Sequence, residues 1–183
     1  MTKPVGYLTN TLTGIEGESG VFYDYILAAG GVYIRAKNAH LAATVCIAPN
    51  EIRGLAPLNE DIQLLHGRIP LYLLNLALSN MVAKPDVEQY LAITWENGYS
   101  LKTPSQQASA VSVTYETLPV TVLEIHSHTG EIPAHLSPID DRDEQGFGLY
   151  AVVAGLRDLC PTVELRLGIH GYFLPIERNE IFT

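Results

Sequence analysis

The sequence predicts a single-domain α+β protein with a three-layer, α/β/α-like mixed sheet. Three observations predict this class. A length of 183 residues suits one hydrophobic core, and a composition of 47% hydrophobic and 17% charged residues is typical of a compact globular domain. Helical and strand patterns are mixed along the chain without regular βαβ alternation. We expect residues 1–20 to form an N-terminal extension and residues 21–183 to form the domain.

The first half of the chain predicts a hairpin, a third strand and a helix. Residues 21–38 hold two aromatic and β-branched runs separated by Gly30 and Gly31, which is a hairpin pattern. Residues 41–48 continue the meander as a strand. Residues 70–83 carry apolar side chains at helical spacing, with a proline near the first turn. These apolar residues are Leu71, Leu74, Leu78 and Met81.

The second half predicts more strands and a second helix. Residues 89–103 and 110–116 alternate as strands, and Asn97-Gly98 marks a tight turn within the first segment. A strand follows over residues 120–128. We expect a helix over residues 138–156, and then one or two closing strands over residues 163–175.

Charge and composition exclude several classes of partner. A net charge of −9 opposes binding to nucleic acid or to an anionic membrane, because both require clustered Lys and Arg. No apolar stretch reaches the roughly 18 residues of a membrane span. The start of the chain lacks the apolar run of a secretory signal, so we expect a cytoplasmic protein. Cys46 and Cys160 lack the spacing of a redox or thiolate metal motif.

The most informative stretch is EIHSHTGEIPAHLSPIDD, residues 124–141. Alternate side chains of a strand point to the same face, so His126 and His128 can converge on one metal ion. A catalytic zinc takes three protein ligands, and Asp140 is the natural third, with Asp141 as an alternative. The same residues also suit a helix start, with Ser137 as the N-cap.

The order of these residues resembles a known signature. His126-Ser127-His128, eight residues, Ser137, two residues and Asp140 resemble the pattern of the JAMM metalloproteases, the JAB/MPN (Mov34/MPN/PAD-1) family. That pattern is His-Ser/Thr-His, seven residues, Ser, two residues and Asp. The loop here is one residue longer, and GFGLYAVVAGL looks closer to the bacterial members.

The resemblance implies a fold, a cofactor and a reaction. The implied fold is the MPN or cytidine-deaminase-like one, and the implied cofactor is a Zn²⁺ ion held by His126, His128 and Asp140. Ser137 would lie near the oxyanion. In that family a zinc-activated water hydrolyses the isopeptide bond between a ubiquitin-like protein and a lysine. The implied partner here is a protein substrate of the ubiquitin-like or sulfur-carrier type.

The general base is the point where the chain departs from the family. The family glutamate begins an apolar strand that ends in glycine, and the corresponding segment here, YDYILAAGG, contains no glutamate. Asp24 is the nearest acid in it. Glu124 is the rival, because it lies two residues before His126 and so shares the strand face of both histidines. A third alternative is that no working base exists.

Three functions follow from these alternatives. The first is a zinc-dependent isopeptidase or peptidase that hydrolyses an amide bond. The second is a catalytically silent MPN-like module that binds a partner protein, which the missing glutamate favours. The third is a small-molecule zinc hydrolase, because the sequence does not identify the pocket wall that selects a substrate.

Overall fold

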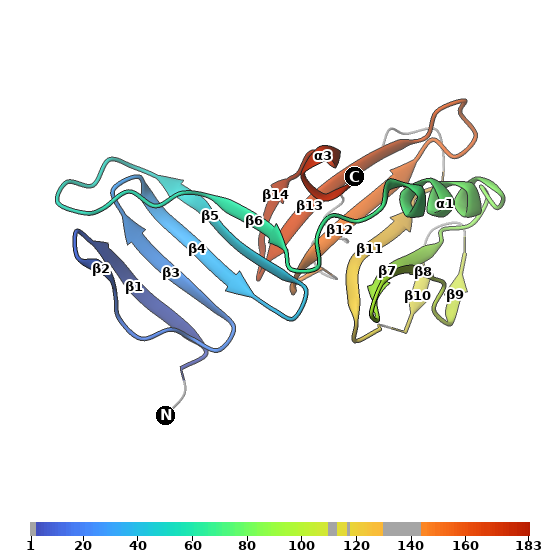
Figure 1. Cartoon of the computed structure of the whole chain (residues 1–183). Coiled ribbons are helices and arrows are strands. Elements are labelled where there is room, and N and C mark those ends of the chain that lie inside the picture. The colour runs from blue at the N-terminus through green and yellow to red at the C-terminus, as the bar shows by residue number, and fades with distance from the viewer. Residues whose placement is uncertain (1–2, 110–112, 117, 130–143) are drawn as a thin grey trace. The chain divides into compact units, whose positions relative to one another are not determined.

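The chain is mostly β and divides into two compact units. The structure is a computed structural model that describes residues 3–109, 113–116, 118–129 and 144–183. The units are Met1–Gly67 and Arg68–Thr183, and each contains a six-stranded sheet (Figure 1). Strands account for 49% and helices for 10% of the structure. The predicted α+β, three-layer α/β/α fold is therefore wrong, because strands form most of the structure and no helical layers enclose the described sheets.

The sheet of the first unit has the strand order β2-β1-β3-β4-β5-β6. The predicted hairpin is confirmed as β3 and β4, and the predicted third strand as β5. β1 pairs in parallel with β3, so residues expected in the N-terminal extension form part of this sheet. The boundary expected after residue 20 is thus not the boundary between the two units. The strands are β1 (Val5–Thr11), β2 (Gly14–Glu16), β3 (Tyr23–Ala28), β4 (Gly31–Lys37), β5 (Leu41–Pro49) and β6 (Asp61–Leu64).

The large sheet of the second unit has the strand order β14-β13-β12-β11-β7-β8. β11 pairs in parallel with β12 and antiparallel with β7. The predicted turn at Asn97 joins β7 to β8, and Asn97 has the positive φ of 62° that such turns require. The strands are β7 (Tyr90–Trp95), β8 (Tyr99–Lys102), β11 (Thr121–Ser127), β12 (Phe147–Ala154), β13 (Thr162–Ile169) and β14 (Tyr172–Pro175); β9 (Gln106–Ala108) and β10 (Val113–Tyr115) form a separate ribbon.

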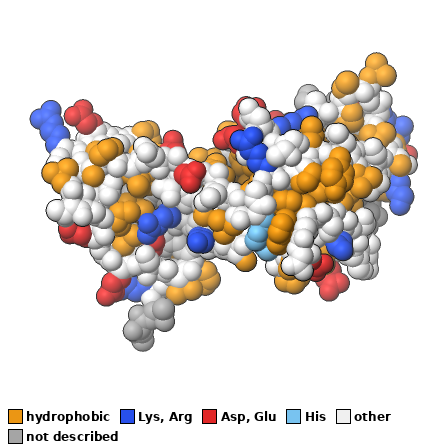
Figure 2. All heavy atoms as spheres, viewed as in Figure 1, with side chains coloured by type: hydrophobic (Ala, Val, Ile, Leu, Met, Phe, Trp, Pro, Cys, Tyr) orange, Lys and Arg blue, Asp and Glu red, His pale blue; other side chains and the backbone are white. Residues whose placement is uncertain are grey.

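One helix helps to bury the apolar residues of the second unit. α1 (Leu71–Val82) confirms the helix predicted over residues 70–83. It buries Leu73, Leu74, Ala77 and Met81, which recur on one side of a 3.6-residue period. A short helix, α3 (Arg178–Ile181), follows β14. The outer side of α1 is less polar than is usual for an exposed helix, because Tyr72 and Leu76 are exposed, and hydrophobic side chains gather there (Figure 2).

The helix predicted over residues 138–156 is wrong for its second half. Residues 147–154 form β12, which has neighbours on both sides and is almost fully buried. A strand buried on both faces reads as a continuous apolar run, and periodicity cannot separate such a run from a buried helix. The β-branched pair Val152 and Val153 was the local signal for a strand. Residues 138–143 lie outside the described residues.

The described helices are short. None of them is long and apolar enough to cross a membrane.

Candidate metal centre

The two histidines of the predicted site meet at the end of β11. His126 is in the strand and His128 follows it, so their side chains share one face of the sheet. Their Nε2 atoms are 3.2 Å apart. Two nitrogens that each lie 2.0 to 2.1 Å from a tetrahedral zinc would be separated by about 3.3 to 3.4 Å. The observed spacing therefore fits two imidazole ligands of one ion.

The serine between the histidines fixes the end of this strand. Ser127 is fully buried on the opposite face, and its Oγ accepts a hydrogen bond of 2.9 Å from the main-chain N–H of Gln89. The Gln89 side chain donates to the carbonyls of Met81 and Lys84 at 2.9 and 3.0 Å, where α1 ends. Met81 is in the last turn of α1 and Lys84 lies just beyond its end, where helix carbonyls lack partners inside the helix. Ser127 thus couples the histidine strand to the end of α1.

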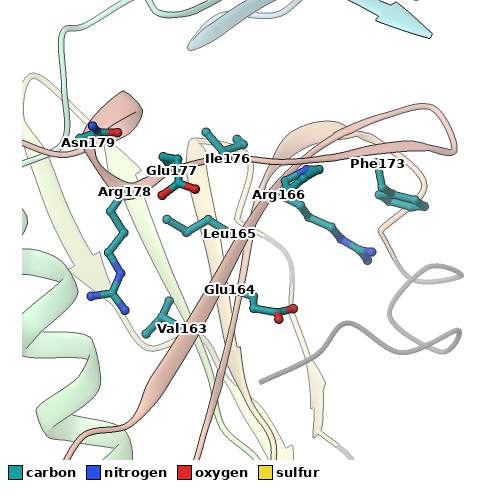
Figure 3. A pocket seen from close by; sticks show the side chains of 10 residues that line it. Val163, Glu164, Leu165, Arg166, Phe173, Ile176, Glu177, Arg178 and Asn179 are labelled. Carbon is teal, nitrogen blue, oxygen red and sulfur yellow. The ribbon is translucent and has the colours of Figure 1, made fainter. Parts of the chain in front are cut away.

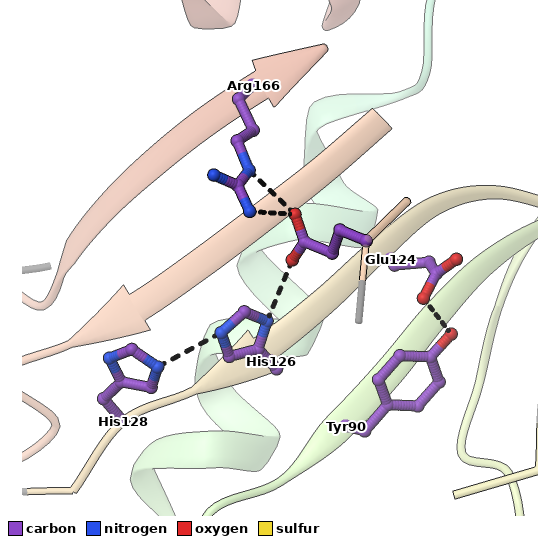
Figure 4. A network of polar contacts seen from close by, with 6 residues as sticks. Tyr90, Glu124, His126, His128 and Arg166 are labelled. Atoms are coloured by element: carbon purple, nitrogen blue, oxygen red, sulfur yellow. Dashed lines mark hydrogen bonds and ion pairs between the residues drawn. The ribbon is translucent and has the colours of Figure 1, made fainter. Parts of the chain in front are cut away.

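A buried ion pair supports His126 from the other side. Glu144 and Arg166 are each 5% exposed. Glu144 Oε2 accepts a hydrogen bond of 2.7 Å from Arg166 Nε and forms an ion pair with Arg166 Nη2 at 2.6 Å. The other oxygen, Oε1, lies 3.8 Å from His126 Nδ1. A carboxylate on the Nδ1 side of an imidazole favours the tautomer that leaves Nε2 free to bind a metal. Figure 4 shows these contacts running from Arg166 to His128.

Glu124 faces Tyr90 and forms a pair separate from the histidines (Figure 4). Its Oε2 accepts a hydrogen bond of 3.0 Å from the Tyr90 hydroxyl. Burial raises the pKa of Glu124, and the Tyr90 hydrogen bond and the positive charge of His126 oppose that rise. Burial, with the nearby carboxylate, also raises the pKa of Tyr90, so this hydroxyl stays protonated and donates. The role predicted for Glu124 as a proton shuttle stays a prediction.

A further acid, the half-buried Glu88, lies two residues before β7. Tyr90 of β7 is the partner of His126 in β11, and the next main-chain bond joins Ser127 N–H to the Gln89 carbonyl at 2.9 Å. Antiparallel partners share a face, so this register, continued past the ends of both strands, assigns Glu88 to the position opposite His128. Among the described residues, Glu88 does not form a metal-binding group with the two histidines. The Glu88 backbone is held by a 2.7 Å hydrogen bond to the Ser109 carbonyl.

Asp24, the other predicted base, lies in the first unit and has structural contacts there. It is 6% exposed. Its Oδ1 accepts from the Gly20 N–H at 2.7 Å, and its Oδ2 accepts from Arg35 at 2.8 Å. Both oxygens therefore hold the segment that precedes β3 against β4. A catalytic role for Asp24 stays a prediction.

The remaining predicted site residues lie outside the described residues. They are Ser137, Asp140 and its alternative Asp141. In the part of the chain that the structure describes, no three or more His, Cys, Asp or Glu side chains form a group that could hold a metal ion. The described part of the candidate centre is thus a pair of imidazoles with its supporting groups.

Sequence reasoning missed Glu88, Glu144 and Arg166. Glu144 lies in the segment predicted as a helix, and Arg166 lies in a predicted closing strand. No local pattern marks them, since they are 22 positions apart in the sequence and are brought together by the pairing of β12 with β13. One feature of the sequence could have identified Glu88 as a candidate: this acid lies just before the apolar strand that follows the predicted helix.

Comparison with known proteins adds no relative. No protein-family model matches the chain, and no curated protein matches its sequence.

Proposed function

We propose that this protein is a zinc-dependent hydrolase that cleaves an amide bond, as an isopeptidase or peptidase. The observation that carries the proposal is the 3.2 Å separation of His126 Nε2 and His128 Nε2, with a buried carboxylate behind His126. The order of His126, His128, Ser137 and Asp140 and its resemblance to the JAMM signature also support it. When bound, zinc supplies Lewis acidity that polarises an amide carbonyl and activates water.

The surrounding side chains have distinct parts in this proposal. Glu144, fixed by Arg166, orients the His126 ring, and Ser127 fixes the strand that carries both histidines. Glu88 is the acid that we assign to proton transfer, because the pairing of Tyr90 with His126, continued by two residues, assigns it to the position opposite His128, and a carboxylate at such a site can accept and return a proton. Asp140 as third ligand and Ser137 at the oxyanion remain part of the proposal through the sequence resemblance.

The substrate that we propose is a protein or peptide. A ubiquitin-like or sulfur-carrier partner follows from the resemblance alone. The preference for an amide bond in a protein over a bond in a small molecule also follows from the resemblance alone. The cytoplasmic location stays a prediction.

The first test is the zinc content of the full chain after dialysis, measured by mass spectrometry. We expect about one zinc per chain, lost in His128→Ala. His40→Ala is the matched control, because His40 and His66 form another close imidazole pair, with Nδ1 and Nε2 3.1 Å apart. Zinc that persists in His128→Ala, or that is lost only in His40→Ala, would overturn the proposed centre.

The second test separates metal binding from turnover. Glu88→Gln should keep the zinc and lose most of the hydrolysis of an isopeptide-linked ubiquitin-like conjugate, since removal of a general base typically costs about 10² to 10⁴ in rate. Glu164→Gln is its control, because Glu164 is exposed on the same sheet face. Full activity in Glu88→Gln would remove Glu88 from the mechanism.

A further inference from the structure

A hollow of about 640 Å³ lies beside β13 in the second unit. The last residues of β14 and the α3 turn form its other walls (Figure 3). Its apolar lining includes Leu165, Ile176 and Phe173, and its charged lining consists of Glu164, Arg166, Glu177 and Arg178. Apolar and charged side chains thus both line the hollow, whereas a packing defect in the core is lined by apolar side chains.

One wall of the hollow is an open strand edge. β13 runs from Thr162 to Ile169, but β14 pairs only with residues 166–169. The last main-chain hydrogen bond between these two segments is donated by the Ile176 N–H to the Leu165 carbonyl at 2.9 Å. The main chain of Leu165 therefore faces the side of β13 on which β14 lies. Main-chain groups of alternate residues point to the same side of a strand. The N–H and C=O of Val163 therefore face the hollow, and no described strand pairs with them there.

The outer edge beside this opening is protected, whereas the opening itself is not. β14 has only four residues and ends at Pro175, which has no N–H to offer to another strand. Short edge strands and prolines are the usual means by which proteins prevent unwanted strand pairing. Val163 has an N–H and a C=O available instead, and these lie next to buried apolar side chains.

The charge at the rim selects the kind of side chain that fits. Arg178 is exposed, and no acid among the described residues pairs with its guanidinium. Arg166, in contrast, is buried against Glu144 and lies 3.9 Å above the Phe173 ring. Two acids also line the hollow: Glu164 is exposed, and the Glu177 side chain accepts from the Glu180 N–H at the start of α3. An acidic side chain of a ligand can therefore pair with Arg178 alone among the exposed charges of the lining, and the apolar wall at Leu165 and Ile176 favours an aliphatic one.

We propose that this hollow is a docking site for an extended peptide segment of a partner protein. The segment pairs by its main chain with Val163, as in recognition by strand addition, and presents an aliphatic residue to Leu165 and Ile176 and an acidic residue to Arg178. Binding needs no metal, so this proposal does not rest on the proposed hydrolase.

The test uses a fluorescein-labelled hexapeptide, Gly-Thr-Val-Asp-Val-Thr, and fluorescence anisotropy with the full chain. We expect saturable binding below about 1 mM. Two further probes carry an N-methyl group on the aspartate or on the valine before it. Because only alternate residues of an added strand donate toward Val163, one N-methylation should weaken binding about tenfold and the other less than about twofold. Equal effects of the two, or no saturable binding, would overturn the proposal.

Variants of the protein provide the complementary test. Val163→Pro removes the donor at the open edge and should abolish binding, whereas Val163→Ile should retain it. Arg178→Glu should weaken binding at least about fivefold. Arg53→Glu, a charge reversal at an exposed site of the first unit, should leave it unchanged, and so should His128→Ala. Binding by Val163→Pro at the wild-type affinity, with unchanged circular dichroism, would contradict strand addition.

Discussion

The two units each contain a pair of histidines in close contact, and the pair in the second unit has a buried ion pair beside it. In the first unit His40 Nδ1 and His66 Nε2 are 3.1 Å apart. In the second unit the Nε2 atoms of His126 and His128 are 3.2 Å apart. The separations of the ring centroids, 5.3 and 5.0 Å, are also similar. Distance between nitrogens therefore does not distinguish the two pairs.

The electrostatic surroundings do distinguish them. Glu144, held by Arg166, lies behind His126 with Oε1 3.8 Å from Nδ1, and a carboxylate there favours the tautomer that carries its proton on Nδ1. Burial lowers the pKa of His40, and the charge of His66 lowers it further. The first pair is thus explained as a hydrogen bond between two rings, in surroundings that disfavour the charged form of His40. A carboxylate that orients one imidazole is what turns two adjacent histidines into candidate ligands.

The largest expected effect comes from breaking the support of the second pair. Arg166→Ala leaves Glu144 as a buried charge without its main partner, and we expect the second unit to lose about 3 to 5 kcal/mol of stability. Trp95, the one tryptophan of the chain, lies in this unit, so its fluorescence during urea unfolding measures the loss. Arg35→Ala, which removes the half-exposed partner of Asp24 in the first unit, is the control and should not shift this transition. A loss below about 1 kcal/mol would show that the ion pair is not needed for the fold.

A smaller effect is expected on metal affinity. Glu144→Gln keeps the shape of the side chain but removes the charge behind His126, and zinc should bind about 10 to 100-fold more weakly. Competition with a chromophoric chelator measures the affinity. The exposed neighbour Glu164→Gln should bind zinc as the wild type does. Equal affinity of the two variants would mean that the two histidine pairs do not differ in the way described.

A third change tests whether the first unit contributes to the chemistry. Asp24→Asn weakens the hydrogen bonds to Gly20 and Arg35 and should cost the first unit about 1 to 3 kcal/mol. Zinc content and turnover should stay as in the wild type. Hydrogen exchange of peptides from β1 and β3 measures the stability. If stability were retained and turnover lost, Asp24 would be the base after all.

The smallest effect is the pH dependence of the first pair. The pKa of His40 in the folded chain lies below its ordinary value of 6.5, so the unfolded chain binds the proton more readily. The stability that neutral His40 supports is present above about pH 6.5 and falls as the pH drops below it. Thermal melting of the first unit at about pH 7.5 and about pH 5.5 should show a loss that His40→Gln reduces. An equal loss in both proteins would assign the acid sensitivity to other groups.

The sequence by itself determined the elements that depend on local patterns. The hairpin of β3 and β4 follows from two β-branched runs around Gly30 and Gly31, and α1 follows from apolar residues at helical spacing after Pro70. The shared face of His126 and His128 follows from the two-residue period of a strand. These features need only interactions between residues close in the chain.

The tertiary structure alone decided the class of fold and the support of the candidate site. The apolar run of residues 147–154 became a strand because neighbours on both sides complete its hydrogen bonds. The pairing of β12 with β13 brings Arg166 to Glu144, and the pairing of β11 with β7 sets Tyr90 opposite His126. Contacts between residues far apart in the chain depend on strand register, and register is fixed by the burial of whole sheet faces, which no short motif contains.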